Sequence, residues 1–478
     1  MAYIKGVDKS QVSFMTNTLD EFIDINNPVR VIEAFVNILN LEELGFNQYD
    51  QYSSGQKPYD RNDLLKLHIY GYMNRLRTSR KLETETKRNI ELIWLIGNLT
   101  PDHGTISKFV KDNKAAFRKV LKKFTTMLKE WNLIDGELIA IDGTKIKAQN
   151  SLKNIVTLKK LEKINAYYDE QIEKYIKEIE MIDNENTLEI PKMTSEKAVK
   201  KVEDYLNRKN ELEKTKKEMI DNKLTQITLT DPESRYMKNN GKFEACYNVQ
   251  VSVDSKNKLI IDCDVVNDIN DQSQLSNMVN LSKETLKQEN IASVADKGYF
   301  NGKDIKKVIT QNDTVYIKPQ STKRSAEKDY SKEKFIYNKE KDNYICPEGQ
   351  TLGFKENTSK DGVNFKRYKG ENCETCINKN KCTTANARTI TRSEYEEYCD
   401  EAIKFTMGHN EIYKKRQEIV EHPFGTIKGN WGYTIFYRRG LQSVNAEGAL
   451  FCVAYNMKRI INILGVKEIV QRLYSPSV

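Results

Sequence analysis

Three acidic side chains stand where their carboxylates could bind metal ions together. Asp142 closes the short apolar run 138–141, and Asp296 closes a second apolar run, 291–295. An apolar run that ends in an acid is typical of a buried strand with the acid at its mouth. Glu421 lies in a later helical pattern. Because crowded carboxylates repel one another, such a cluster favours divalent cations, and hard oxygen atoms suit Mg²⁺.

The segments between these acids predict the elements that must position them. Alternating apolar residues in 243–253 and 258–266 predict a β-hairpin, and residues 275–286 read as a helix. The order strand, hairpin, helix, strand and late helix is that of an RNase H-like nuclease core. Pro423 conflicts with the helical pattern of 411–428, so we expect a bend there or a helix that begins close to the acid.

The chain before the first strand is predicted to be helical and to contact DNA. A turn at 101–104 precedes a helical pattern that carries Lys108 and Lys111 among other basic residues. A short helix, a turn and a basic second helix would form a helix-turn-helix reader of DNA. A helical bundle with a solvated basic face is the alternative for the same pattern.

Two insertions are predicted to interrupt the catalytic core. Residues 151–223 are rich in Lys and Glu, and their apolar residues step by three or four, which predicts two helices paired as a hairpin. The fold class we predict is α/β, with an RNase H-like core split by this hairpin and by a Cys-rich insertion, after an all-helical N-terminal region. The predicted boundaries are 1–135 for the helical DNA-binding region, 136–150, 224–315 and 400–464 for the core, 151–223 for the hairpin, 316–399 for the Cys-rich insertion and 465–478 for a C-terminal tail.

Four of the eight cysteines lie together in the Cys-rich insertion, at Cys346, Cys373, Cys376 and Cys382. Four thiolates in a compact segment suit tetrahedral Zn²⁺, so we predict a structural zinc site. Four unligated thiols are the alternative, because a single pair with two intervening residues is a weaker signal than two such pairs.

Five segments, taken in order, resemble the motifs of Asp-Asp-Glu transposases of bacterial insertion sequences. They read LIAIDGTKIKAQNS, TDPESRYM, YNVQVSVD, ADKGYFNG and VEHPFGTIKGNWG, and the resemblance covers about residues 13–464. The chain is most similar to the group called IS eleven-eighty-two, which carries a helical insertion after the first Asp and a Cys cluster before the Glu.

The Glu segment also resembles the family's Tyr-Arg-Glu-Lys signature. The signature maps onto Tyr413, Arg416, Glu421 and Lys428, which the resemblance makes candidates for contact with DNA or, for the Glu, with metal. Arg416 departs from the commoner spacing by one residue, and Glu418 is a rival carboxylate. Arg438 and Arg439 follow in a tract with Trp431, Tyr433 and Tyr437, which would grip DNA or form a packed aromatic core.

The resemblance implies a DNA transposase that binds terminal inverted repeats, frees 3′-OH ends and transfers them into target DNA. Asp142 would bridge two Mg²⁺ or Mn²⁺ ions, and Asp296 and Glu421 would each complete one of them. Double-stranded DNA is the expected partner, with a homodimer or higher multimer on DNA. A nuclease without strand transfer and a catalytically silent DNA-binding protein derived from a transposase are the alternatives.

The overall charge agrees with a polyanionic partner but does not require one. Of the 478 residues, 77 are Lys or Arg and 68 are Asp or Glu, which gives a net charge of +9. The sequence has no run of about 18 apolar residues and no signal-peptide pattern at its start, so we expect a cytoplasmic protein with no membrane partner, associated with the nucleoid through DNA.

Overall fold

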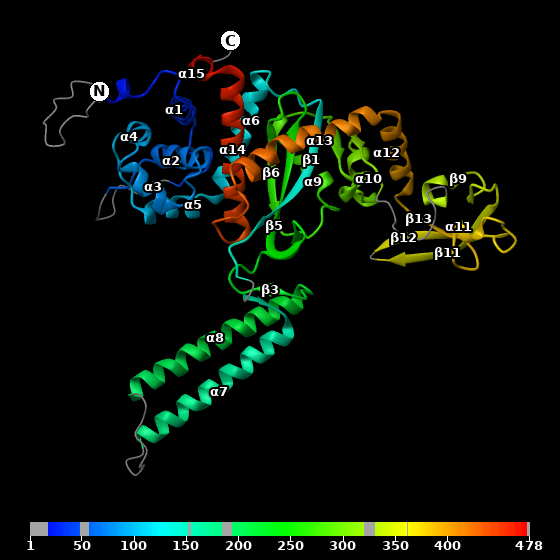
Figure 1. Ribbon diagram of the computed structural model, residues 1–478, viewed down its shortest axis with the longest axis horizontal. Coiled ribbons are helices and arrows are strands. Elements are labelled where there is room, and N and C mark those ends of the chain that lie inside the picture. Colours follow the sequence, from blue (N-terminus) through cyan, green and yellow to red (C-terminus); the bar gives the residue numbers. More distant parts are fainter. Residues whose placement is uncertain are drawn as a thin grey trace, which may run out of the picture. The chain divides into compact units, whose positions relative to one another are not determined.

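The computed structural model describes residues 18–47, 57–151, 154–183, 194–319, 330–360 and 362–475 (Figure 1). The chain divides into two compact units. Unit 1 combines the N-terminal residues up to Phe124 with Phe436–Val478, and unit 2 is Thr125–Ile435. The architecture is mixed α/β, as predicted.

Unit 1 is built from helices. They are α1 (Val29–Asn37), α2 (Arg61–Met73), α3 (Ser79–Thr86), α4 (Ile90–Leu95), α5 (His103–Asp112), the first part of α6 (Lys114–Glu130), α14 (Leu441–Leu464) and α15 (Val466–Tyr474). Side-chain caps fix the starts of several of them. Asp60 accepts the Asn62 N–H at α2, and Asp102 accepts the Thr105 N–H at α5.

The C-terminal part of the chain differs from our predicted boundaries. We assigned 400–464 to the catalytic core and 465–478 to a tail, but Phe436 onward clusters with the N-terminal helices, and 466–474 form α15. Burial explains the difference, because α14 is buried over most of its length and α15 packs against α1. Among the described helices, none is by itself long and apolar enough to cross a membrane; the bent pair α14 and α15 passes that test only when taken together.

Unit 2 is centred on a six-stranded mixed sheet. Its strands are β1 (Leu138–Lys147), β4 (Arg235–Asn239), β5 (Lys242–Asp254), β6 (Ile260–Val266), β7 (Ala292–Ala295) and β8 (Thr314–Tyr316). The path is β4-β5-β1-β7-β8, with β6 also paired to β5. β1 runs antiparallel to β5 and parallel to β7, and β7 runs parallel to β8. The predicted hairpin is β5 and β6, joined in antiparallel register.

Helices cover this sheet and carry the late candidate residues. α9 (Leu275–Leu286) packs on β5 and β6, and α10 (Gly302–Thr310) packs on β8, as does α12 (Glu396–Gly408). α13 (Asn410–Phe424) contacts β1, β5 and β7. Pro423 lies inside α13, which begins at Asn410 and not close to Glu421, and a π-helix, Gly425–Asn430, follows α13 directly.

The first acid strand is longer than we predicted. We placed Asp142 at the mouth of a strand, but β1 continues through Lys147. The reason is that β1 pairs with β5 from Ile139 to Lys147, whereas its pairing with β7 ends at Ile141. Asp142 therefore lies one residue beyond the last parallel pair, where only β5 still flanks the strand.

Two further elements of unit 2 have small cores of their own. The pair β2 (Ile155–Val156) and β3 (Ile227–Thr228) leads into α7 (Leu158–Asp183) and α8 (Ser195–Asp221), which lie side by side as an antiparallel hairpin in Figure 1. Later, β9 (Ile336–Asn338), β10 (Asn343–Ile345), β11 (Thr351–Lys360), β12 (Val363–Gly370) and β13 (Thr389–Ser393) form a five-stranded sheet in the order β13-β12-β11-β10-β9. α11 (Lys379–Cys382) lies between β12 and β13 in the chain.

Candidate active site

Asp142 is held between a backbone donor and a guanidinium. Its Oδ1 accepts the Gly143 N–H at 2.8 Å, and its Oδ2 lies 3.3 Å from Nη1 of Arg416 on α13. Burial raises the pKa of Asp142 to about 6, against the lowering effects of Arg416 and of the Gly143 N–H, while the charges of Asp296 and Asp271 raise it further. The protonation of Asp142 therefore responds to one cation and to two neighbouring acids.

Asp296 follows β7 directly and begins a short 3₁₀ turn, Lys297–Tyr299. Its Oδ1 accepts the Gly298 N–H at 2.6 Å, which fixes the carboxylate at the strand end. The turn approaches the acids closely: a Cβ added at Gly298 would lie 2.8 Å from Oδ1 of Asp296 and 3.8 Å from Oδ2 of Asp271. Parallel pairing of β1 and β7 thus brings Asp142 and Asp296 to one edge.

Asp271 is a neighbour of this pair that the sequence did not single out. It lies in the connection between β6 and α9, and its Oδ1 accepts Asn248 Nδ2 and Gln250 Nε2, both at 2.7 Å. The sequence signal was weak, because Asp271 sits in a polar turn with other acids and no apolar run leads into it.

Glu421 is not brought to the pair. Its side chain is exposed, and its Oε1 accepts Gln417 Nε2 at 2.6 Å from the preceding turn of α13. Helix geometry gives the reason, since five residues turn the helix by about 140° beyond a full turn, so Glu421 points well away from Arg416. The rival acid Glu418 forms an ion pair with Lys258 at 3.2 Å.

The other signature residues lie near the two strand acids. Lys428 Nζ donates to Thr144 Oγ1 and to the Lys145 carbonyl, both at 2.9 Å, and burial lowers the pKa of Lys428. Burial raises the pKa of Tyr413; the Arg416 charge opposes this shift, and the Asp296 charge adds to it. Tyr413, Arg416 and Lys428 therefore border the edge that carries Asp142 and Asp296.

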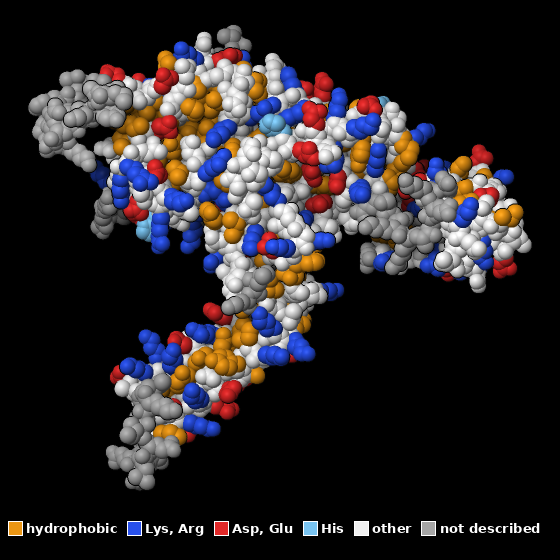
Figure 2. All heavy atoms as spheres, in the orientation of Figure 1, with side chains coloured by type: hydrophobic (Ala, Val, Ile, Leu, Met, Phe, Trp, Pro, Cys, Tyr) orange, Lys and Arg blue, Asp and Glu red, His pale blue; other side chains and the backbone are white. Residues whose placement is uncertain are grey.

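The predicted DNA-contacting residues of unit 1 lie on the surface. Lys108 and Lys111 are exposed on α5, which begins after the predicted turn. Figure 2 shows Lys and Arg side chains over the visible face of unit 1, interspersed with acidic ones. α3 adds a basic surface that the sequence analysis missed, with Arg80 and Lys81 exposed.

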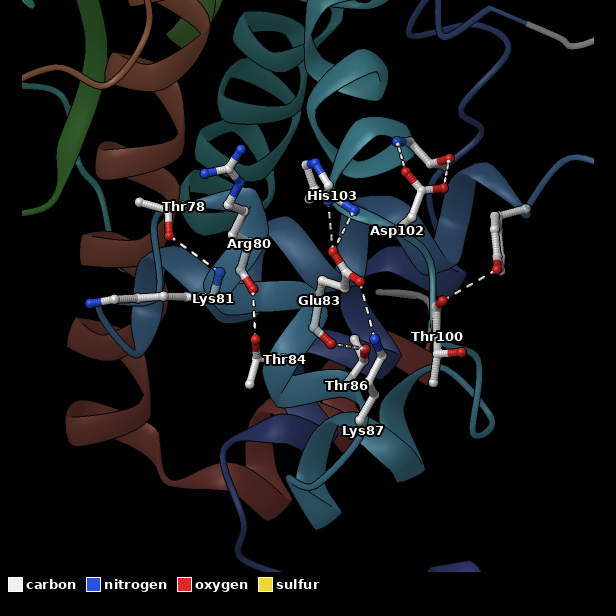
Figure 3. Close-up of polar contacts among 12 residues, drawn as sticks. Thr78, Arg80, Lys81, Glu83, Thr84, Thr86, Lys87, Thr100, Asp102 and His103 are labelled. Carbon is white, nitrogen blue, oxygen red and sulfur yellow. Dashed lines mark hydrogen bonds and ion pairs between the residues drawn. The ribbon is translucent and has the colours of Figure 1, made fainter.

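The start of α5 is joined to α3 by polar contacts (Figure 3). Glu83 accepts the His103 N–H at 3.0 Å and lies 2.8 Å from His103 Nδ1, and it pairs with Lys87 at 3.1 Å. The charged ends of Arg80 and Lys81 take part in none of the contacts drawn, and they point away from Glu83. The Glu83 contacts with His103 therefore hold α3 and α5 together, and both helices carry exposed basic residues.

The aromatic tract beyond the π-helix is mainly packed. Trp431, Tyr433 and Phe436 are buried, whereas Tyr437 is 42% exposed. Arg439 is exposed, and the backbone N–H of Arg438 donates to Glu447 Oε2 at 3.0 Å. Of the two interpretations of this tract, a packed core describes its first part.

The four clustered cysteines line one small cavity of about 30 Å³. Cys346 Sγ accepts the Gln350 N–H at 3.3 Å, and Cys373 Sγ accepts the Arg388 N–H at 3.4 Å. Burial raises the pKa of the Cys382 thiol, Arg388 opposes this shift, and the other three cysteines add to it. As the side chains stand, no group of three or more His, Cys, Asp or Glu in the described segments is arranged to hold a metal ion, either here or at the acids.

Comparisons with known proteins give two family matches. Residues 17–112 match a family described as "Transposase domain (DUF772)", and residues 345–461 match one described as "Transposase DDE domain". Among curated proteins, none matches the chain. A solved structure, the piggyBac transposase in a synaptic complex with hairpin DNA, is similar with a TM-score of 0.32 and 10% identity, over 94% of this chain and 80% of that one. The two family matches support a transposase of the DDE type.

Proposed function

We propose that this chain is a DNA transposase that binds the terminal inverted repeats of an insertion sequence, cuts DNA there and joins the freed 3′-OH ends to target DNA. The observation that carries the proposal is the parallel pairing of β1 with β7 up to Ile141 and Ala295, which brings Asp142 and Asp296 to one sheet edge, with Arg416 3.3 Å from Asp142. The matches to two transposase families support the same conclusion.

The strand arrangement supports an RNase H-like core. Counted across the sheet, β6, β5 and β1 are antiparallel neighbours, and β1, β7 and β8 are parallel neighbours. The sequence predicted such a core from the order of its elements along the chain. In the sheet, β1 carries the first acid, and the second acid directly follows its parallel neighbour β7.

The donor set at this edge suits Mg²⁺ or Mn²⁺. Carboxylate oxygens are hard ligands, and two such ions together activate an attacking oxygen and stabilise a leaving one in phosphodiester chemistry. Asp142, the most central acid, is the proposed bridging ligand, with Asp296 beside it. Burial raises the pKa of Asp142, and the Arg416 charge opposes this shift. Arg416 therefore favours the ionised carboxylate, which is the form that binds a cation. Lys428, next to Thr144, is the proposed contact for a DNA phosphate.

Glu421 is the third carboxylate of the proposal, and it requires a rearrangement of α13. It stands on the helix whose Arg416 already touches Asp142, and inside the segment that matches the DDE family. The π-helix that follows is the place where we expect the helix to shift, because such turns interrupt the regular ladder of hydrogen bonds.

The test is strand transfer by the full chain. Labelled duplexes that end in the terminal repeats flanking its gene are incubated with a plasmid target in Mg²⁺ or Mn²⁺, and cleaved and joined products are separated. We expect joining by the wild type and by Glu418→Ala, a matched exposed control on α13. Joining is expected to be lost in Asp142→Ala, Asp296→Ala and Glu421→Ala, each checked for native circular dichroism.

The same assay distinguishes the alternatives. Metal-dependent cleavage without joined product would identify a nuclease of the same core. Binding of the repeats without any metal-dependent cleavage would identify a catalytically silent DNA-binding protein. For the active transposase we also expect two or more chains in the complex with paired ends, measured by light scattering.

We also propose that Cys346, Cys373, Cys376 and Cys382 hold a structural Zn²⁺. The four thiols share one cavity, two of them accept backbone N–H groups, and Cys346 and Cys382 pack against a small core that contains Phe335 and Leu352. Metal content measured by mass spectrometry is expected to be one zinc per chain, retained in Cys399→Ser and lost in Cys376→Ser. Equal zinc content in both variants would contradict the site.

A further inference from the structure

The hairpin of α7 and α8 has one half that is well packed and one that is not. Next to β2 and β3, Leu161, Leu212 and Met219 are buried in a small core. Further out, the apolar residues that face the other helix by their spacing are only half-buried; they are Ile172, Tyr175, Ile179, Val202 and Tyr205. Of the described residues in this outer half, Ala198 alone is buried. Two helices by themselves therefore leave the outer half incompletely covered.

Two ion pairs between the helices identify one face of the hairpin. Lys209 pairs with Asp169, and Lys216 lies 4.0 Å from Glu162. Residues three, four or seven positions apart share a face of a helix, so counting outward from these pairs gives the residues of the same face further along. They are Ile176, Val199, Val202 and Leu206, which we call the outer patch.

The outer patch is apolar and open to solvent. Ile176 is 42% exposed, Val199 41% and Leu206 45%, and Val202 is half-buried. Figure 2 shows hydrophobic side chains gathered along the hairpin between charged ones. A group of adjacent apolar side chains, in contrast to single ones, is typical of a surface that meets another protein.

The charges around the outer patch favour a second copy of the hairpin over DNA. On this face α7 contributes only acids, whereas α8 contributes mainly lysines; they are Glu162, Asp169, Glu173 and Glu180 on α7, and Lys209, Lys216, Lys217 and Glu213 on α8. The acids of α7 would repel DNA phosphates. A second hairpin that sets its α8 against α7 would bring opposite charges together, whereas α7 against α7 would bring acids together.

The size of this face matches that of a stable interface. The helices have 26 and 27 residues. At a rise of about 1.5 Å per residue the hairpin is about 40 Å long, and two packed helices are about 20 Å wide. One face thus offers about 800 Å², which is what each partner buries in a standard protein–protein interface. Two hairpins packed face to face form a four-helix bundle, in which each covers the outer patch of the other.

We propose that the α7–α8 hairpin is a dimerisation surface, on which the outer patch packs against the outer patch of a second copy of this chain, with α7 of each copy opposite α8 of the other. Such a contact uses the same surface on both copies and closes on itself, so it gives a dimer and not a filament. The inference goes beyond the proposed function, because it names the surface by which two copies meet and holds for the chain without DNA.

The first test is the mass of the full chain without DNA, measured by light scattering after gel filtration at several concentrations. The wild type is expected to have twice the mass of one chain at micromolar concentration. Leu206→Glu and Ile176→Glu place a charge in the apolar contact and are expected to raise the dissociation constant of the dimer about tenfold or more. The matched control is Asn207→Glu, which adds the same charge about 100° further round α8 and is expected to leave the dimer intact.

Three results of this test would overturn the inference. They are a wild type that is monomeric at every concentration, a dimer that both patch variants retain, and a dimer that Asn207→Glu loses equally. Because the measurement uses neither DNA nor cleavage, its failure would leave the proposed transposase activity standing, and loss of that proposal would leave the dimer standing.

The second test needs no variant and so does not depend on the folding of one. In hydroxyl-radical footprinting of the wild type, oxidation of Ile176 and Leu206 is expected to fall as the concentration is raised through the range in which the dimer forms. Tyr167, which is 50% exposed on the opposite face of the hairpin, is expected to keep its oxidation. Unchanged oxidation of Ile176 and Leu206, or protection that appears only when duplex DNA is added, would contradict a dimer built on the outer patch.

Discussion

Two titratable side chains, Asp142 and His68, have contrasting roles because their surroundings differ. Asp142 is half-buried, and the charges of Asp296 and Asp271 act on it, whereas His68 is buried among apolar rings. The His68 ring lies 5.8 Å from Phe109 and 6.2 Å from Phe117 between centroids, and Nε2 is 3.0 Å from the Ile106 carbonyl. His68 is therefore a core residue of unit 1.

We predict that His68 makes unit 1 less stable as the pH falls below neutral. Burial, with the charge of Arg438 in support, lowers the pKa of His68 to about 3, whereas an unfolded histidine titrates near 6.5. The unfolded chain therefore takes up a proton that the folded chain does not. The contribution of neutral His68 to the free energy of unfolding is fully present above pH 6.5. It is lost as the pH falls, by about 2 kcal/mol between pH 6.5 and 5.

Urea unfolding measured across this range tests the prediction. The slope of the free energy of unfolding against pH is expected to flatten in His68→Gln. It is expected to persist in His103→Gln, a control at a histidine whose side chain is 51% exposed. A nuclear magnetic resonance titration that gives His68 a midpoint near 6.5 in the folded chain would contradict it.

The site residues also show what sequence patterns can identify. Asp142 and Asp296 were predictable because each follows an apolar run, and backbone pairing then fixes where the acids go. Asp271 was not, because its position depends on side-chain amides of β5 that no local pattern records. Glu421 was identified by motif, and its direction depends on how α13 is rotated, which a motif does not specify.

At the scale of elements, a buried ion pair joins α14 to the N-terminal part of unit 1. Glu447 of α14 is fully buried, and its Oε1 lies 2.7 Å from Arg77 Nη2. Its Oε2 accepts the N–H groups of Tyr437 and Arg438, both at 3.0 Å. The Arg77 guanidinium lies 4.3 Å from the Tyr437 ring centroid. One carboxylate thus serves a cation and two backbone donors.

We predict that Glu447→Ala destabilises unit 1 by about 3–5 kcal/mol, because it leaves a buried guanidinium and two backbone donors without their acceptor. Glu468→Ala, which removes the partly exposed pair with Arg472 on α15, is the matched control and should cost about 0.5 kcal/mol or less. Both are measured by thermal or urea unfolding of the full chain. Equal effects of the two substitutions would show that the buried pair has no special role.

Element boundaries were predictable where the hydrophobic periodicity was strong. They were less predictable where strand pairing determines how far an element extends. The hairpin α7 and α8 was evident from apolar residues at helical spacing. The extension of β1 to Lys147 was not, because residues 143–147 are mostly polar and owe their strand conformation to pairing with β5. The placement of α14 was also missed, since helical periodicity does not say which distant helices a buried face will meet.

At the scale of the whole molecule, we expect the basic helices of unit 1 to contribute to DNA binding. Arg80 and Lys81 on α3 are exposed, and each ion pair with a DNA phosphate releases counterions. We predict that Arg80→Ala combined with Lys81→Ala lowers the magnitude of the slope of log affinity against log salt by about 2. Fluorescence anisotropy with labelled duplex measures this slope.

The control for that measurement is Lys467→Ala combined with Arg472→Ala on α15, which removes the same charge from another helix of unit 1. An equal change in slope for both pairs would mean that only the total charge of the chain matters. The chemistry proposed for unit 2 would make a separate demand, because cleavage by the proposed centre would need cations at Asp142 and Asp296 however DNA is bound.

The most direct test of that requirement is to exchange a proposed ligand for a thiol and then change the metal. In a cleavage assay with repeat-end DNA, Asp142→Cys and Asp296→Cys are each measured in Mg²⁺ and in a softer ion, Mn²⁺ or Cd²⁺. Because thiolates bind Mg²⁺ poorly and softer ions well, we predict a loss of about a hundredfold or more in Mg²⁺ and a clear recovery in the softer ion. The same loss in every metal, or undiminished cleavage in Mg²⁺, would contradict the claim that these two side chains bind the catalytic cations.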